Sequence, residues 1–119
     1  MDSGAYIAVF HMPKEQAIRV GKLGRFHFRQ GVYFYAGSAQ RNLSTRLERH
    51  SRKKKPLRWH VDYLSVKASM LGAIVIDGQR ERECEIAKEL GKMYELAVFG
   101  FGSSDCRCAG HLFYISELP

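Results

Sequence analysis

Short apolar runs bounded by turn residues are the feature that most limits what this chain can fold into. Three such runs, rich in aromatic and β-branched side chains, occupy residues 5–10, 32–36 and 71–76. A turn-forming proline or glycine follows each of them, as expected where a strand ends. Each run is short and continuously apolar, which is typical of a buried strand. The core is therefore expected to form around a small sheet.

Two further regions alternate apolar with polar residues, which predicts strands with one face in water. Residues 17–20 and 25–28 flank the glycine-containing stretch 21–24, and this pattern predicts a hairpin at the edge of the sheet. Residues 111–115 predict a last strand near the end of the chain.

Two stretches have the residue spacing of helices. The first begins at Asn42 or Ser44, either of which can cap a helix, and runs to about residue 54, before Pro56. The second runs from about Arg80 to Tyr94. Its apolar stripe consists of Ile86, Ala87, Leu90, Met93 and Tyr94. Residues 59–64 fit a helical turn or a strand.

The order of these elements predicts one domain over residues 1–119, of the α/β or α+β class, with a small, mostly antiparallel sheet flanked by helices. Hydrophobic residues make up 45% of the chain and charged residues 26%, which is the balance of an ordinary soluble protein. Neither a bilayer-spanning run nor the pattern of a signal peptide is present, so a cytoplasmic location is expected. The odd number of cysteines, 3, predicts reduced thiols and not a disulfide framework.

The net charge of +7 predicts attraction to polyanions such as nucleic acid. The basic excess is concentrated between residues 41 and 58. The residues expected to contact a phosphate backbone there are Arg49, Arg52, Lys53, Lys54, Lys55 and Arg58. No array of base-reading motifs accompanies them, so recognition of backbone or structure is favoured over recognition of sequence. The alternative is a basic helix end that is merely solvated.

Glu83 is unusual for its place, since it falls inside the apolar stripe of the second expected helix. A carboxylate that faces a core needs a metal ion, an arginine or several hydrogen-bond donors beside it. The alternative is a helix-start carboxylate that only favours the positive end of the helix dipole. On the first expected helix, Arg46 and His50 are four residues apart and share a face. Phosphodiester cleavage needs a fixed cation, a base and usually a metal, so these residues are candidates for that chemistry.

Several short motifs on separate expected elements combine into one pattern. They are Gly4-Ala5-Tyr6, Tyr35-Ala36-Gly37, Arg46 followed by His50, and Glu83 leading Ile86-Ala87. Together they resemble the GIY-YIG nuclease superfamily. The segments Trp59-His60-Val61-Asp62-Tyr63-Leu64 and Gly100-Phe101-Gly102-Ser103-Ser104-Asp105-Cys106 are similar to a prokaryotic branch of it that occurs alone or fused to DNA-repair endonucleases. The resemblance covers nearly the whole chain, and the hairpin of residues 17–28 is an addition to the usual pattern.

The resemblance implies a metal-dependent endonuclease that hydrolyses DNA phosphodiester bonds, directed to unusual structure or damage. One divalent ion, Mg²⁺ or Mn²⁺, would be held by Glu83. Tyr35 would be the general base or would orient the attacking water, with Tyr6 as a supporting phenol and Arg46 as the clamp on the phosphate. His50 stands where relatives have a tyrosine or a histidine. The alternatives are a noncatalytic nucleic-acid-binding module, and a domain that docks a DNA-repair protein.

Two further groups of residues leave alternatives open. His60 and Asp62 would share one side of an extended segment, either as a second base or metal site or as a hydrogen-bonded pair beside Trp59. Cys106, Cys108 and His111 could be ligands of a soft metal. A tetrahedral zinc site needs a fourth ligand, however, and zinc-binding cysteine pairs usually have two to four residues between them. Buried thiols in a capping loop are therefore the favoured interpretation.

Overall fold

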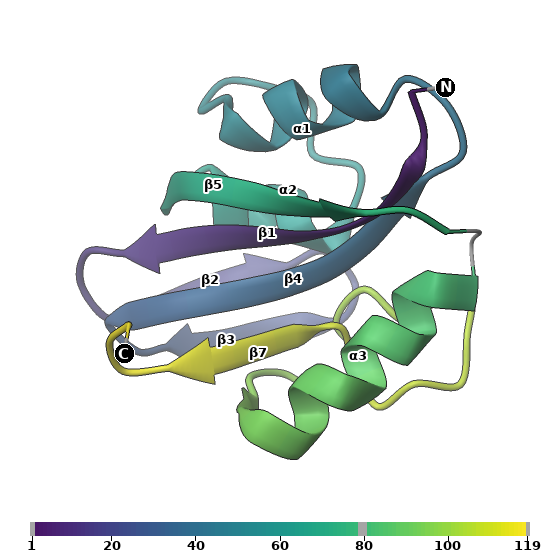
Figure 1. Ribbon diagram of the computed structural model, residues 1–119. Coiled ribbons are helices and arrows are strands. Elements are labelled where there is room, and N and C mark those ends of the chain that lie inside the picture. Colours follow the sequence, from purple (N-terminus) through teal and green to yellow (C-terminus); the bar gives the residue numbers. More distant parts are fainter. Residues whose placement is uncertain (1, 79–80, 119) are drawn as a thin grey trace.

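The computed structural model describes residues 2–78 and 81–118 and has a five-stranded antiparallel sheet at its centre (Figure 1). The strands are β1 (Gly4–Met12), β4 (Gly31–Ala39), β5 (Ser69–Ile76), β6 (Glu95–Leu96) and β7 (Leu112–Ile115). Their order across the sheet is β5-β1-β4-β7-β6, and every neighbouring pair is antiparallel. The expected α+β class with an antiparallel sheet and flanking helices is confirmed.

The core lies on both faces of this sheet. On one face, Tyr6, Phe10 and Met12 of β1 pack with residues of the hairpin and of the first two helices. On the other face, Ala5 and Phe113 pack against Ile86 and other residues of the helix after β5. Because two layers cover the central strands, β1 and β4 are buried along most of their length.

The hairpin is formed by β2 (Gln16–Val20) and β3 (Gly24–Phe28), as predicted, but its position differs from the expectation. It makes a separate two-stranded sheet and does not extend the edge of the main one. Ile18, Val20 and Phe28 are buried in the core cluster on the β1 face. The apolar face of the hairpin therefore covers the sheet as a second layer, because that arrangement buries these side chains.

β4 continues through Gly37 to Ala39, although the sequence suggested that the strand ends at this glycine. Gly37 pairs with Tyr6 of β1 in the strand register. A side chain at position 37 would place its Cβ atom 2.6 Å from both Cζ and the hydroxyl oxygen of Tyr6. The glycine is thus required by the close approach of the Tyr6 ring, and not by a turn.

Helix α1 (Leu43–Ser51) begins where predicted but ends before residue 54. Neither expected cap acts through its side chain, because the carboxylate of Asp2 accepts the backbone N–H of Ser44 at 3.1 Å. At the other end, Nζ of Lys55 donates to the carbonyl of Arg49 at 2.8 Å. This lysine caps the helix from outside, so the chain turns away earlier than the basic run suggests.

Two more helices complete the fold. Residues 59–64, which fit either state, lie mostly in helix α2 (His60–Ser65). Helix α3 (Glu81–Met93) matches the second expected helix, whose predicted first residue, Arg80, lies outside the described residues. Ile86, Ala87 and Leu90 are buried as predicted, but Met93 is 65% exposed, since it is the last residue of the helix. Within residues 2–78 and 81–118, no helix is long and apolar enough to cross a membrane.

β5 was expected to be buried, and this prediction is wrong. Leu71, Ile74 and Val75 are 54%, 57% and 49% exposed. β5 is the edge strand of the sheet beside β1, so the second layers that cover the central strands reach it only in part. An apolar run therefore identified the strand correctly but not its place in the sheet.

Candidate functional site

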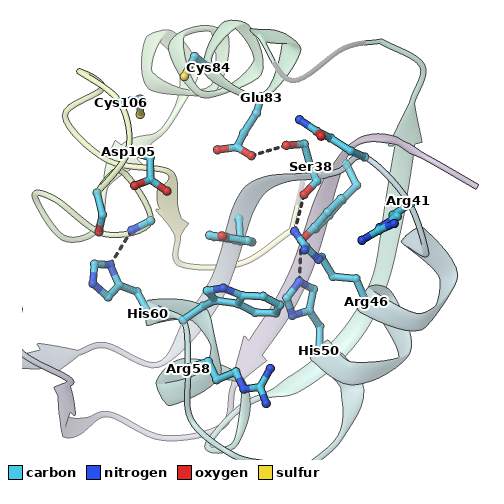
Figure 2. A pocket seen from close by; sticks show the side chains of 16 residues that line it. Ser38, Arg41, Arg46, His50, Arg58, His60, Glu83, Cys84, Asp105 and Cys106 are labelled. Carbon is cyan, nitrogen blue, oxygen red and sulfur yellow. Dashed lines mark hydrogen bonds between the residues drawn. The ribbon is translucent and has the colours of Figure 1, made fainter.

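A cavity of about 520 Å³ lies between the two tyrosine-bearing strands, α1, the start of α2, the first turn of α3 and the loop before β7 (Figure 2). All five residues expected to take part in catalysis line it, namely Tyr6, Tyr35, Arg46, His50 and Glu83. They come from β1, β4, α1 and α3, which are distant in the sequence. The fold therefore brings together the residues that the motifs singled out.

Tyr6, Tyr35 and His50 form an aromatic cluster at the inner wall of the cavity. The hydroxyl of Tyr6 lies 2.7 Å from Nε2 of His50, and the ring centroids of Tyr6 and Tyr35 are 6.4 Å apart. The His50 ring meets the Tyr35 ring edge-on at 6.0 Å. Gly102, with φ 72°, lies against Tyr35 from the loop side, where an added Cβ would be 3.0 Å from the ring. Close packing on both strands and the loop thus sets the positions of the phenols.

Burial controls the protonation of this cluster. It lowers the pKa of His50 to about 4, and the ammonium of Lys55 acts in the same direction. The imidazole is therefore neutral at neutral pH. Burial also raises the pKa of Tyr6 and of Tyr35 well above that of a free phenol, so both hydroxyls keep their protons. Only neutral hydrogen-bonding groups face the cavity from this wall.

Arg46 supplies a positive charge from α1. Its Nη1 donates to the backbone carbonyl of Ser38 at 2.6 Å. Its guanidinium carbon lies 4.6 Å from the centre of the Trp59 ring, a stacked cation–π arrangement. One hydrogen bond and one aromatic face thus hold the guanidinium at the cavity wall, and its fork of five N–H donors suits a phosphate.

Glu83 supplies a carboxylate from the first turn of α3, and Figure 2 shows it entering the cavity from a different side than Arg46. Its Oε1 accepts a hydrogen bond from the hydroxyl of Ser38 at 2.7 Å, and its Oε2 lies 3.0 Å from Nδ1 of His111. Burial lowers the pKa of His111, but Glu83 and Cys108 outweigh it and raise the value to about 9. One hydroxyl donor and one histidine ion pair therefore provide the compensation that an inward carboxylate needs.

A carboxylate such as that of Glu83 is the type of side chain that can hold a divalent ion of the Mg²⁺ type as a single ligand. The Glu83 side chain is 23% exposed and lines the open cavity. Mg²⁺ binds through one or two carboxylates and keeps waters or substrate phosphates as its other ligands. Ser38 and His111 would orient the carboxylate from behind.

The basic segment divides into an internal and an external part. Asp62 is fully buried, and its Oδ2 accepts from Nη2 of Arg49 at 2.7 Å. Its Oδ1 lies 3.7 Å from Nζ of Lys55, whose side chain is 0% exposed. Burial opposes ionisation of Asp62, but the N–H groups of Trp59 and Arg58 and the charge of Arg49 outweigh it and lower its pKa. Arg49 and Lys55, expected on a nucleic-acid surface, therefore hold the fold together.

The other predicted basic residues are exposed. Arg52 forms an ion pair with Glu48 at 2.8 Å, and Lys53 donates to the carbonyl of Ala68. Lys54 stands on the same exposed stretch, and Arg58 lines the rim of the cavity. This part of the segment continues the positive charge of the cavity onto the surface.

His60 and Asp62 bind different partners, so neither interpretation of them as a pair is supported. Because the segment is helical, the two side chains do not share the face that an extended strand would give them. Nδ1 of His60 accepts the backbone N–H of Gly102 at 2.9 Å. His60 thus lines the cavity and anchors the loop, whereas Asp62 belongs to the buried ion-pair network.

Several residues that line the cavity were not among those expected to act in catalysis. They are Ser38, Gln40, Arg41, Trp59, Ser104 and Asp105. Ser38 directly follows the second tyrosine motif, Gln40 stands two residues later, and Arg41 begins the basic segment, so their positions in the sequence were informative. No feature of the sequence indicated that Trp59 stacks on Arg46 and Arg49 of α1. This contact depends on how α2 packs against α1.

Cys84 is the other residue that the sequence did not point to. It follows Glu83 on α3 and lies beside Cys106, Cys108 and His111, and all three cysteines are free thiols, as expected. Burial and the neighbouring sulfurs of Cys108 and Cys106 raise the pKa of the Cys84 thiol to about 12. Cys84 and Cys106 also line the cavity, at the side where Glu83 enters it.

Comparison with known proteins places the chain in a family. A family model, the domain of unknown function DUF123, matches residues 5–119. Neither the curated proteins nor the solved structures include a match to the chain. Because the family model spans Tyr6, Tyr35, Glu83 and the cysteines, the whole site lies within the matched region. The chain belongs to the DUF123 family.

Proposed function

We propose that the chain is a metal-dependent endonuclease of the GIY-YIG type that hydrolyses phosphodiester bonds in DNA of unusual structure or with damage. One observation carries the proposal: a single cavity is lined by Tyr6, Tyr35, Arg46, His50 and Glu83. Two phenols, an arginine, a neutral imidazole and one carboxylate are the groups that positioning and charge stabilisation of a phosphoryl centre require.

Arg46 is the clamp on the scissile phosphate. Its stacking on Trp59 and its bond to Ser38 preorganise the guanidinium, so little reorganisation is needed when negative charge develops on phosphate. Arg41 and Arg58 lie at the same cavity and attract the flanking phosphates.

Tyr6 and His50 act as a hydrogen-bonding pair. Since His50 is neutral, its Nε2–H can donate to the phenolic oxygen and leave the Tyr6 hydroxyl proton for a substrate oxygen. In the described part of the chain, no hydrogen-bond partner lies beside Nδ1 of His50. An unpaired acceptor is less costly than an unpaired donor, which favours this tautomer.

Tyr35 positions the attacking water. Burial keeps its phenol protonated at neutral pH, which favours the orienting role over that of a general base. Its half-buried ring lies between His50 and Phe101, with centroid distances of 6.0 and 6.2 Å. This packing fixes the direction of the hydroxyl, as positioning of a nucleophile requires.

Glu83 is the residue that would hold one Mg²⁺ or Mn²⁺ ion. The ion, when bound, neutralises charge on the phosphate and lowers the pKa of water. The carboxylate is kept in place through Ser38 of β4 and His111 of the loop before β7.

The exposed basic residues are proposed to bind the DNA backbone beyond the cavity. The double variant Lys54→Glu with Arg58→Glu should weaken binding to every DNA tested and reduce the salt dependence by about one counterion per lost phosphate contact. Lys88→Glu, an exposed lysine on α3, is the matched control and should bind normally. Lys55 is left unchanged because its ammonium lies in the core. Equal binding by the double variant and the control at low salt would remove this surface from the proposal.

One observation favours a second candidate, a noncatalytic nucleic-acid-binding module. Both oxygens of Glu83 already have partners within the protein, in Ser38 and His111. A carboxylate committed in this way could serve structure alone, while Arg46 holds a phosphate without cleavage.

Cleavage of a panel of labelled duplex, single-stranded, flap and branched DNAs with Mg²⁺ or Mn²⁺ distinguishes the two candidates. Wild type should nick at least one structured substrate, and Glu83→Gln and Tyr35→Phe should not. Glu85→Gln, an exposed carboxylate on the same helix, is the control and should cleave like wild type. Binding without nicking by all four proteins would identify a binding module.

A further inference from the structure

The cysteines of the chain gather with one histidine in a compact cluster. Sγ of Cys84, Cys106 and Cys108 and a ring nitrogen of His111 all lie within 4.8 Å of one another. The chain contains only 3 cysteines, so every thiol it has takes part. We propose that these four side chains hold one zinc ion, a site separate from the carboxylate at which Mg²⁺ or Mn²⁺ would bind.

The distances suit a single tetrahedral ion. With Zn–S near 2.3 Å and Zn–N near 2.0 Å, the ligand atoms of a tetrahedral site lie roughly 3.5–3.8 Å apart. Nε2 of His111 lies 3.5 Å from Sγ of Cys106 and 4.0 Å from Sγ of Cys84. Side-chain shifts of no more than about 1 Å would complete the geometry.

The orientation of His111 also matches that of a metal ligand. Its Nε2 faces the sulfurs, while its Nδ1 lies 3.0 Å from Oε2 of Glu83. A carboxylate on the far nitrogen is the usual outer partner of a zinc-binding histidine, because it fixes the tautomer and the ring plane. The ring is fully buried, so packing holds it in this direction as well.

The types of the four side chains select the metal. Thiolates with one imidazole favour zinc over Mg²⁺ or Ca²⁺, which prefer oxygen ligands. Four protein ligands fill a tetrahedral shell and leave no position for water or substrate, so the site is structural. As the ion binds, each thiol and Nε2 of the protonated His111 ring release a proton to solvent, the ring binds the ion through Nε2, and Nδ1 keeps its proton beside Oε2 of Glu83.

The position of the cluster explains what the ion would do. Residues 97–111 form no helix or strand, and they carry Cys106, Cys108 and His111. Cys84 lies on the first turns of α3. Zinc would therefore tie the helix to the loop where both border the cavity, as Figure 2 shows for Cys84 and Cys106. Through His111 it would also fix the direction of the Glu83 carboxylate.

The test uses the chain of residues 1–119, purified with reductant, stripped with a chelator and then titrated with Co²⁺ as a spectroscopic substitute for zinc. We expect about one ion per chain, with intense tetrahedral d–d bands and a sulfur-to-cobalt charge-transfer band. Added Zn²⁺ should displace the cobalt, and chelation should lower the thermal midpoint.

Variants separate this site from other cobalt ligands. In Cys84→Ser and in Cys106→Ser, the charge-transfer intensity should fall below that expected of three thiolates. His27 is an exposed histidine outside the cluster, so His27→Ala should keep the full intensity. If a serine variant fails to fold, the wild-type titration decides by itself. The proposal would be overturned by an octahedral cobalt spectrum that lacks the sulfur band or by uptake of much less than one ion per chain. It would also be overturned by a disulfide bond among the three cysteines in protein purified with reductant. No arm depends on DNA cleavage, so failure here is distinct from failure of the nuclease assignment.

Discussion

Asp62 is at the centre of a buried ion-pair network, and its replacement by asparagine tests how the basic segment is held. Oδ2 of Asp62 accepts from Nη2 of Arg49 at 2.7 Å and from the N–H groups of Arg58 and Trp59 at 2.8 and 3.0 Å. The same carboxylate is 3.7 Å from the fully buried ammonium of Lys55. An amide can keep part of the hydrogen bonding but removes the negative charge.

The magnitude follows from that lost charge. Removing one partner of a buried ion pair leaves an uncompensated charge and costs about 3–5 kcal/mol. For a domain of this size, a thermal midpoint moves by about 4 °C per kcal/mol, so Asp62→Asn should lower it by about 12–20 °C. Adding Lys55→Met to Asp62→Asn should recover roughly half of the loss, because a buried ammonium is then replaced by an apolar side chain of similar length.

The assay is urea and thermal unfolding at pH 7, repeated at lower pH. The pKa of Asp62 is lowered in the folded state from its ordinary 3.8, so its contribution is complete above that value and disappears as the pH falls through the folded pKa. The deficit of Asp62→Asn should therefore shrink below about pH 4. Glu48→Gln, which breaks the exposed pair with Arg52, should change little. An Asp62→Asn protein as stable as wild type, or no rescue by Lys55→Met, would refute the reasoning.

The site itself yields two further stability predictions. Gly37→Ala should lower the free energy of unfolding by about 1–3 kcal/mol and displace the Tyr6 ring, since the added Cβ would lie 2.6 Å from that ring. The control, Gly72→Ala, should be tolerated because nothing lies within 4 Å of its added Cβ. Equal thermal midpoints for the two variants would contradict this prediction. Because burial lowers the pKa of His50 to about 4, the unfolded chain takes up the proton first as the pH falls. The free energy of unfolding, measured with urea, should therefore fall by about 2 kcal/mol between pH 7 and pH 5. In His50→Gln this part of the pH dependence should be absent.

Local pattern predicted most of the elements, though not the short strand β6, and it did not predict how the elements are arranged. Alternation in residues 17–20 and 25–28 gave the hairpin, whereas its place over the β1 face depends on which layer can bury Ile18 and Phe28. The apolar pattern of residues 71–76 predicted a buried strand, but β5 is an exposed edge strand. The position of a strand in a sheet depends on its pairing with distant strands. Strand pairing and layer packing between distant segments are therefore not visible in the local sequence pattern.

For the candidate site, too, the sequence indicated individual residues but not all of their contacts. The tyrosine motifs, Arg46 with His50, and Glu83 were singled out from the sequence, and they line one cavity. The inward positions of Arg49 and Lys55 could not be predicted, because they pair with the carboxylate of Asp62, which lies on another helix.

The fourth member of the thiol cluster was missed for the same reason. Cys84 is far along the chain from Cys106 and Cys108, and only the packing of α3 beside the loop brings them together.

The most direct test of the central claim is single-turnover nicking of the best substrate from the DNA panel, with Kd measured for each protein. Glu83→Gln should bind that DNA with the wild-type Kd and nick it at least about a hundredfold more slowly in Mg²⁺ or Mn²⁺, because the proposed ion loses its ligand. Equal nicking rates for wild type and Glu83→Gln would contradict the assignment of the metal site. Absence of nicking by the wild type on every substrate, with tight binding, would replace the endonuclease by a binding module.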